Sequence, residues 1–440
     1  MTTQNEKTAG KHSVMLKITV IVILIMVLLL PSLLILELVQ ERKQRQTEAI
    51  HEVSSKWGND QIICGPVLTV PYLEYTKTRN NDSAMYTKKY AYFLPENLNI
   101  SGKVNSSIRY RGIFEVAVFN ADMKFSGKFN FPDFTKWNIP EHLIQWNEAF
   151  LTLGISDMRG IKESINFNWA GQTIECDPGS MIGNFINSGV TIKINNLAAQ
   201  KEMPLAYSFN LVLNGSRNLS FAPLGKETVT EISSPWKDPK FDGAFLPKRE
   251  ISETGFKASW KILHLNRNIP QQWINEMPDY YSSVFGITFF MPADNYLKSE
   301  RSAKYAILFI TLTFLVFFFI EILNKLRVHP VQYALVGLGL CLFYLLLISL
   351  SEQIGFLWAY VIASIGIISL IVLYAASVFK NKKVVGIVAS VLILLYSYIY
   401  VLLQLEDYAL LMGSLGLFVV LAVIMYLSRK VNWYELGKEN

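Results

Sequence analysis

One carboxylate in the last third of the chain lies within a strongly apolar run. Glu321 closely follows the phenylalanines at 317–319, and a helix-breaking His329-Pro330 pair comes shortly afterwards. An ionisable residue inside a membrane span is a functional candidate, for example as a proton or ion relay. The alternative is an interfacial ion pair with Lys325, one helical turn later, which marks the end of the span. We favour the ion pair, because the neighbouring apolar runs carry no second charge near their centres.

Two further polar residues could act in the same region. His329 could pair with Glu321 across the turn that Pro330 predicts. Tyr344 lies on a helical stripe with Gly337, where a small residue permits close approach of helices and a tyrosine hydroxyl can donate a hydrogen bond across the interface. We favour helix packing over a ligand pocket for this stripe.

The sequence lacks the common motifs of hydrolytic, nucleotide-binding and redox sites. None of the five histidines stands in an HExxH or HxxxH pair, so a zinc hydrolase has no visible ligand set. The GxSxG elbow, the Walker A loop, the GxGxxG motif and the CxxC pair are also absent. We therefore predict no catalytic residue, no metal and no cofactor. The basic residues form no clustered stripe, which argues against nucleic acid as a partner.

Three cysteines are present, and two of them lie in the long polar middle of the chain. Cys64 and Cys176 could form a disulfide bond if that region lies outside the cytoplasm. The alternative is two unpaired buried thiols, and both states are compatible with the sequence. Cys341 lies in an apolar run and is expected to pack as a small hydrophobic residue.

Apolar residues concentrate in six segments that are long enough to cross a membrane. The first, residues 18–36, follows several lysines and is not followed by a small-x-small cleavage site, which predicts an uncleaved anchor helix. The other five come after residue 300 and form a predicted bundle, with spans at 305–323, 331–350, 355–379, 384–405 and 408–427.

The charges of the short loops predict the orientation of these spans. Lysine and arginine occur in the loops at 324–330 and 380–383 and at the start of the C-terminal tail. The alternate loops carry Glu352, Glu406 and Asp407 and no basic residue. By the positive-inside rule, both termini are cytoplasmic and the polar middle of the chain lies outside.

The region 40–304 shows apolar and polar residues in alternation. The runs at 123–129, 207–213 and 256–262 each place apolar residues on one face and polar residues on the other. This period is typical of half-buried antiparallel strands, and clusters of Gly, Pro and Asn separate them. We predict a mainly β domain, either a sandwich or two packed lobes, with a short helix at 48–61 that leads into it.

Together these patterns predict a polytopic membrane protein with four parts. Residues 1–39 form a cytoplasmic tail and anchor helix, 40–304 the outer β domain, 305–428 a five-helix transmembrane bundle, and 429–440 a cytoplasmic tail. The lipid bilayer is therefore one expected partner of the chain.

One stretch of the outer domain combines aromatic residues with arginine, the residue types that dominate binding hot spots. Trp236, Phe241, Phe245 and Arg249 are therefore candidates for a surface that contacts a partner outside the membrane. The alternative, which we favour, is an ordered loop that packs its own aromatic rings on the β core.

Long segments of the chain resemble one known family. The runs RYRGIFEVAVFNADMKFSGKF from Arg109, SSPWKDPKFDGAFLPKRE from Ser233 and HPVQYALVGLGLCLFYLLLISL from His329 are similar to the CreD family of bacterial inner-membrane proteins. The resemblance implies a multi-pass protein of the bacterial inner (plasma) membrane, with a periplasmic domain and a link to cell-envelope integrity. The family is associated with two-component regulation and with altered tolerance to colicins or cell-wall antibiotics, and the resemblance brings no catalytic residues.

We therefore expect a non-enzymatic protein whose β domain binds an unidentified periplasmic or envelope partner. A second hypothesis is a transporter of a small envelope component, which requires a polar path through the bundle. A third is a membrane enzyme that acts on a lipid-linked substrate. It requires acidic groups such as Glu352 to meet Arg301 or Lys304 in a cleft at the outer membrane surface.

Overall fold

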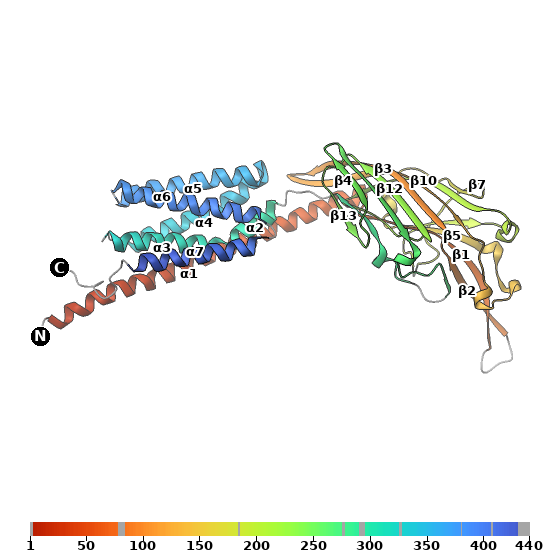
Figure 1. Ribbon diagram of the computed structural model, residues 1–440, viewed down its shortest axis with the longest axis horizontal. Helices are drawn as coiled ribbons and strands as arrows, with labels where there is room; N and C mark the ends of the chain where they lie inside the picture. Colours follow the sequence, from red (N-terminus) through yellow and green to blue (C-terminus); the bar gives the residue numbers. More distant parts are fainter. Residues whose placement is uncertain are drawn as a thin grey trace. The chain divides into compact units, whose positions relative to one another are not determined.

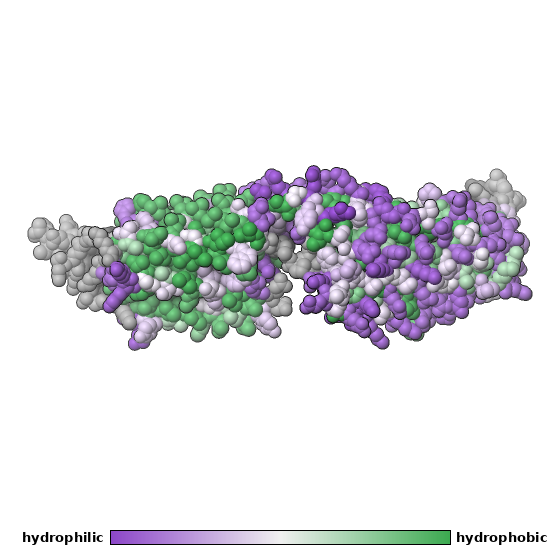
Figure 2. All heavy atoms as spheres, turned by 90° about the horizontal axis from the view of Figure 1, so that it is seen from above, coloured by the Kyte–Doolittle hydropathy of each residue, from purple (hydrophilic) through white to green (hydrophobic). Residues whose placement is uncertain are grey.

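The computed structural model describes residues 3–77, 84–183, 185–274, 278–289, 295–324, 328–379, 381–405 and 408–429 (Figure 1). The chain forms two compact units. One unit is helical and combines Met1–Gln46 with Ala293–Asn440, and the other, Thr47–Pro292, is mainly β. Figure 2 shows apolar side chains over much of the helical unit and hydrophilic side chains over much of the β unit.

The described helices match the predicted anchor and bundle. They are α1 (Thr3–Trp57), α2 (Asn295–Lys304), α3 (Ala306–Leu323), α4 (Pro330–Ile354), α5 (Phe356–Phe379), α6 (Lys382–Gln404) and α7 (Ala409–Ser428). All of them except α2 contain a segment that is long and apolar enough to cross a membrane. The prediction of one anchor helix and five further spans is therefore confirmed.

α1 is longer than the sequence suggested. Separate helices were expected at 18–36 and 48–61, but neither proline nor glycine separates them, and the chain continues as one helix. An ion pair between Glu52 and Lys56 supports the polar half of α1 at the favourable i,i+4 spacing. The helix ends at Trp57, shortly before the first strand begins.

α2 belongs to the helical unit, although its residues were expected in the outer domain. It packs against α3, α4, α5 and α6. Tyr296, Ser299, Glu300 and Ala303 are buried at helical spacing, so one face of α2 lies on the bundle. The β unit, Thr47–Pro292, is therefore shorter than the predicted range 40–304. The polar composition of α2 had suggested that these residues belong to the outer domain.

The described strands form two sheets. The nine-stranded sheet has the order β13-β17-β11-β1-β5-β9-β8, with β2 beside β1 and β16 beside β2. Its strands are β1 (Gln61–Lys77), β2 (Ala84–Phe93), β5 (Ala149–Ile155), β8 (Asp177–Pro178), β9 (Gly189–Ile194), β11 (Asn218–Phe221), β13 (Pro239–Gly243), β16 (Gln272–Ile274) and β17 (Phe285–Phe289).

The eight-stranded sheet has the order β14-β15-β12-β3-β4-β10-β6-β7. Most of its neighbouring strands are antiparallel, and β12 pairs with β3 in parallel. Its strands are β3 (Asn97–Arg111), β4 (Phe114–Phe129), β6 (Phe167–Trp169), β7 (Gln172–Ile174), β10 (Leu205–Ser216), β12 (Glu227–Ser234), β14 (Lys248–Ser252) and β15 (Gly255–Leu263).

The two sheets pack face to face around one core, so the domain is a sandwich rather than two lobes. Rings from opposite sheets meet in this core. The ring centroid of Phe119 on β4 lies 5.1 Å from that of Phe289 on β17, and Trp260 on β15 lies 5.3 Å from Phe285. The three alternating runs noted in the sequence form parts of β4, β10 and β15 and supply inward-facing residues.

The outer faces of the two sheets differ in polarity. A second apolar cluster covers the nine-stranded sheet, and Phe185, Trp273 and Tyr280 pack together within it. The eight-stranded sheet instead presents polar residues such as Lys124 and Asn210, both exposed, on its outer face. Within the described part of the β unit, this second face is accessible.

Candidate functional site: ion pairs of the first helix

The end of α3 and the start of α4 position the groups around Glu321. α3 ends at Leu323, only two residues after this carboxylate. α4 begins at Pro330, whose missing N–H costs nothing in the first turn of a helix. His329 caps that turn, because its Nδ1 accepts a hydrogen bond from the Val331 N–H at 3.3 Å. The first turn of α4 therefore lies beside the last turn of α3.

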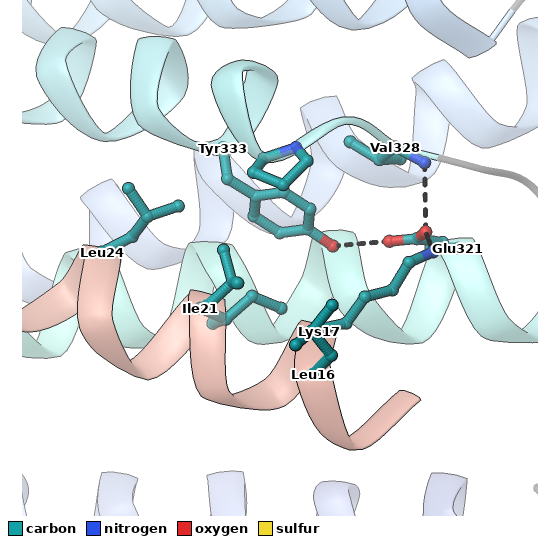
Figure 3. A pocket seen from close by; sticks show the side chains of 9 residues that line it. Leu16, Lys17, Ile21, Leu24, Glu321, Val328 and Tyr333 are labelled. Carbon is teal, nitrogen blue, oxygen red and sulfur yellow. Dashed lines mark hydrogen bonds and ion pairs between the residues drawn. The ribbon is translucent and has the colours of Figure 1, made fainter. Parts of the chain in front are cut away.

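Glu321 is buried and accepts hydrogen bonds from three donors (Figure 3). Lys17 of α1 donates to Oε1 in an ion pair. The Val328 N–H donates to the same oxygen at 3.0 Å, and the Tyr333 hydroxyl donates to Oε2 at 3.0 Å. The Glu321 side chain is 4% exposed and that of Lys17 is 36% exposed. Together the three donors hold the buried Glu321 side chain in one position.

The structure gives Glu321 a partner that the sequence did not suggest. Lys325 lies outside the described residues. The predicted pairing with His329 is wrong, because the His329 side chain is exposed and caps α4. The ion-pair partner is Lys17, which lies 304 positions earlier in the chain. The sequence does indicate that Lys17 and Glu321 lie at the ends of two spans on the same side of the membrane. It has no local spacing pattern that would predict their contact.

A cavity of about 220 Å³ adjoins this cluster, between α1 and the facing turns of α3 and α4 (Figure 3). Its walls are mainly apolar and include Val20, Ile21 and Leu24 of α1. Glu321 lies at one end of it, and the Tyr333 ring lies along its wall with the hydroxyl directed at Glu321. We call this space the α1 crevice.

The stripe predicted on α4 is buried and packs partly against α1. A Cβ atom at Gly337 would come within 2.2 Å of the Leu28 side chain of α1, so the glycine permits this close approach. Cys341 is also buried, with its Sγ 4.0 Å from the Leu28 carbonyl oxygen. Tyr344 lies deeper in the bundle, where its ring packs against Phe309. Helix packing is thus the observed role of these side chains.

The hydroxyl of Tyr344 does not make the predicted hydrogen bond. Within the described residues, the hydroxyls of Tyr344 and Tyr396 are buried and have no hydrogen-bond partner. Tyr360, by contrast, donates its hydroxyl to the main-chain carbonyl of Tyr396 at 2.8 Å. The three rings pack around Phe343, so this seam between α4, α5 and α6 is an aromatic core.

Glu352 lies at the other end of α4 and contacts α1 and α2. It accepts a hydrogen bond from the Tyr296 hydroxyl at 2.9 Å and lies 3.8 Å from the Arg42 Nε. The hypothesis of a membrane enzyme requires Glu352 to meet Arg301 or Lys304. The structure gives Tyr296 and Arg42 as its contacts, and Glu406 and Asp407 lie outside the described residues.

Glu300 of α2 makes a second contact of this kind. Its carboxylate lies 2.8 Å from the Lys304 Nζ and 3.8 Å from the Lys43 Nζ of α1. The hydrogen bond from Lys304, together with the charge of Lys43, lowers the pKa of Glu300 below its usual value. Sequence reasoning missed this residue because α2 was not recognised as part of the bundle.

α1 therefore has ion pairs at both ends of its apolar segment. We refer to them as the N-terminal ion pair, Lys17–Glu321, and the C-terminal ion pairs, Arg42–Glu352 and Lys43–Glu300, by their order along α1. At about 1.5 Å of rise per residue, the helix positions of Lys17 and Arg42 lie roughly 37 Å apart. This separation matches the hydrocarbon core of a bilayer plus part of the headgroup layers.

The four residues suggested as a partner surface do not form an exposed aromatic patch. Trp236, Phe241 and Phe245 all pack against the core of the sandwich. Trp236, for example, lies edge-on to Phe289 with ring centroids 5.9 Å apart. Arg249 is exposed, and its guanidinium lies 5.6 Å from the Phe241 ring. The favoured alternative, a loop that packs its own rings on the core, describes this stretch.

The suggested disulfide is not formed, because Cys64 and Cys176 are both free. Cys64 is buried in the cluster that covers the nine-stranded sheet, and burial raises the pKa of its thiol. Cys176 packs against the core between the sheets, and its thiol donates to the Ile165 carbonyl at 3.4 Å. The two cysteines thus belong to different hydrophobic clusters.

The family resemblance extends over almost the entire chain. A family model described as "Inner membrane protein CreD" matches residues 13–434. The chain belongs to the CreD family. The inner membrane protein CreD of Escherichia coli (strain K12) is 32% identical over 416 residues, which cover 93% of this chain and 91% of that protein. With six helices able to cross a membrane, this CreD family member is a multi-pass inner-membrane protein.

One solved structure is similar to this CreD family member only in part. It is an M1 zinc metallopeptidase variant from Deinococcus radiodurans bound to a Tyr-Ser-Ala substrate. The match covers 44% of this chain and 42% of that chain, at 9% identity and a TM-score of 0.23, and it carries no argument about fold or function. Among the described residues, no group of three or more His, Cys, Asp or Glu side chains could hold a metal ion.

Proposed function

We propose that this CreD family member contributes to cell-envelope integrity through a non-enzymatic binding role of its β domain. In this proposal both termini are cytoplasmic and the β domain lies in the periplasm, as the loop charges indicate. The helical unit anchors the domain in the inner membrane. The ligand is an envelope component rich in hydroxyl and amide groups.

A polar groove on the outer face of the eight-stranded sheet carries this proposal. The groove has a volume of about 390 Å³ and lies over β4, β6, β7 and β10. Polar side chains from several strands and from the segment before β6 line it, among them Lys124, Glu163, Asn168, Thr173, Ser208 and Asn210.

The strand register explains why these polar groups gather. Ser208 of β10 pairs with Ser126 of β4 and with Asn168 of β6, and Asn168 pairs with Thr173 of β7. Because side chains alternate between the faces of a strand, these residues form a polar ladder on the outer face. Phe209, between Ser208 and Asn210, points into the core. The alternating sequence of β10 therefore supplies both the apolar inner face and the polar outer face of the sheet.

The chemistry of the groove favours a neutral ligand with many hydrogen-bonding groups. Amide and hydroxyl side chains both donate and accept hydrogen bonds. Lys124 and Glu163 add one positive and one negative charge, so the lining has little net charge. A glycan or peptide-like envelope component fits such a lining better than a polyanion or an apolar ligand does.

Blocking the groove in the full-length protein tests the proposal. Asn210→Trp places a large side chain in the groove, and Ser259→Trp places the same side chain on β15, on the same face but outside the groove. In a strain without its own copy of the protein, we expect the Asn210→Trp variant to lose protection against cell-wall antibiotics. We expect the Ser259→Trp variant, at the same membrane level, to keep it.

Two outcomes would count against this proposal. Full protection by Asn210→Trp, at a membrane level equal to that of the unchanged protein, would exclude the groove as the binding site. If replacement of Thr47–Pro292 by a flexible linker left antibiotic tolerance unchanged, the β domain would have no part in envelope integrity.

A further inference from the structure

The α1 crevice is open at the side of the helical unit and is bounded by a charged group at one end. Leu16 of α1, which lines it, is 66% exposed, so the crevice reaches the surface of the helical unit. Ile21 and Leu24 continue the apolar wall along α1 (Figure 3), and Val20 also lines the crevice. The Lys17 ammonium and the Glu321 carboxylate lie at the end away from Leu24. The crevice thus has an apolar length and a polar end.

The position of the crevice along α1 places it at the edge of the bilayer. Only 17% of the strongly apolar segment of this helix is buried within the protein. Ile18, Val22 and Ile23 on the other faces of α1 are exposed, as expected for lipid-facing side chains. Lys17 lies at the start of this segment, where a lysine reaches the headgroup layer. Lipid acyl chains are therefore the medium around the crevice.

At the polar end, the Lys17 ammonium has N–H donors that no described residue other than Glu321 uses. Both oxygens of Glu321 are occupied, one by Lys17 and Val328 and the other by Tyr333. The Lys17 ammonium carries three N–H donors, and with 36% of its side chain exposed it can donate to a second acceptor at the surface. A lipid phosphate is the acceptor that a bilayer supplies at this depth.

We propose that the α1 crevice binds an acyl chain of an anionic phospholipid whose phosphate accepts hydrogen bonds from Lys17. The lipid belongs to the leaflet nearer the N-terminus. Its acyl chain packs against the apolar wall of the crevice, and its headgroup complements the exposed side of the Lys17 ammonium. This site lies in the helical unit and does not depend on the ligand proposed for the β domain, so either proposal can fail alone.

A thermal-shift experiment on the full-length protein in detergent tests the site with two lipid probes. We expect phosphatidylglycerol to raise the midpoint of unfolding more than phosphatidylcholine does, because a ligand that binds only the folded state stabilises it. Leu24→Trp fills the crevice, and Ile23→Trp adds the same side chain on an exposed face of α1. Leu24→Trp should lose at least half of the shift, Ile23→Trp should keep it, and Lys17→Gln should lose the preference for phosphatidylglycerol.

Photo-crosslinking keeps the proposal testable if Leu24→Trp does not fold. A phosphatidylglycerol with a diazirine in its acyl chain should label residues 16–24 and 328–333 severalfold more than the exposed Leu373 of α5. Even labelling of all lipid-facing helices would overturn the proposal, because it would show ordinary contact with the bilayer. A full lipid shift in a folded Leu24→Trp variant would overturn it as well.

Discussion

Lys17 and Glu321 form an ion pair across 304 positions of sequence, and the carboxylate is almost completely buried. Tyr333 and the Val328 N–H bind the same carboxylate, so a single acidic side chain joins α1, α3 and the start of α4. The pair is therefore a specific attachment of the anchor helix to the bundle, and its energy can be measured.

Glu321→Gln removes the charge at nearly constant volume and should lower the free energy of unfolding by about 1–3 kcal/mol. This is less than the loss typical of a fully buried pair, because Lys17 is partly exposed. Unfolding of the purified protein in mixed detergent micelles measures the change. Lys17→Met should also destabilise, and the double variant should lose less than the sum of the single losses. Additive losses would show that the two groups do not interact.

Tyr344→Phe and Tyr360→Phe should have opposite effects on stability. The Tyr344 hydroxyl is buried without a partner among the described residues, so its removal should leave the unfolding free energy unchanged or raise it. The Tyr360 hydroxyl donates to the Tyr396 carbonyl, so its removal should cost about 0.5–1.5 kcal/mol. The two variants control for each other in one unfolding assay. A clear loss in Tyr344→Phe would show that this hydroxyl has a partner.

Asp157 should make the stability of the β unit depend on pH. Arg159 donates to the Asp157 carboxylate at 2.8 and 2.9 Å, the Asn59 N–H donates to it at 2.9 Å, and Arg159 also binds the Ser55 carbonyl near the end of α1. The hydrogen bonds from Arg159 lower the pKa of Asp157 below its usual 3.8. Because the folded-state pKa is the lower one, the stabilisation is complete above about pH 3.8 and is lost as the pH falls further.

The matching measurement compares the unfolding midpoints of the unchanged protein and Asp157→Asn across this range of pH. At neutral pH the variant should unfold at a lower temperature. The difference should shrink as the solution is acidified past the pKa of the aspartate. A difference that stays constant would mean that protonation of Asp157 is not linked to folding.

The free thiols lead to a chemical prediction. Reductant should leave the unfolding midpoint unchanged, because Cys64 and Cys176 are not joined. A maleimide reagent should modify Cys64 only after unfolding, since that thiol is buried and burial raises its pKa. Mass spectrometry with Cys64→Ser as the control assigns the modified residue. A change in gel mobility on reduction would contradict the structure.

The sequence was sufficient for features that repeat locally. Hydropathy located six spans, and the alternation of Phe125 or Phe209 with polar neighbours located strands of the sandwich. Local patterns carry such information because the period of a helix or strand decides which of its residues face the core and which face solvent. The boundary of the β unit was less accurate, because α2 is polar overall and buries Ser299 and Glu300 on the face that packs against the bundle.

The candidate site was harder to predict because its partners are far apart in the chain. Glu321 was recognised as important, but local spacing suggested Lys325 or His329 and could not suggest Lys17. Glu352 was recognised as well, whereas its contacts Arg42 and Tyr296 depend on how α1 and α2 pack. Long-range ion pairs follow from the tertiary structure, which no helical or strand period encodes.

The N-terminal ion pair, Lys17–Glu321, also has a consequence for the order of events during synthesis. α1 enters the membrane early, while the carboxylate that binds Lys17 is made 304 residues later. At about 5–20 residues per second, roughly 15–60 s separate the two, and the entire β unit is translated in that interval. During this interval α1 is in the bilayer without its ionic partners. A delay in the synthesis of Glu321 therefore prolongs the period in which quality-control proteases can act on the unassembled helix.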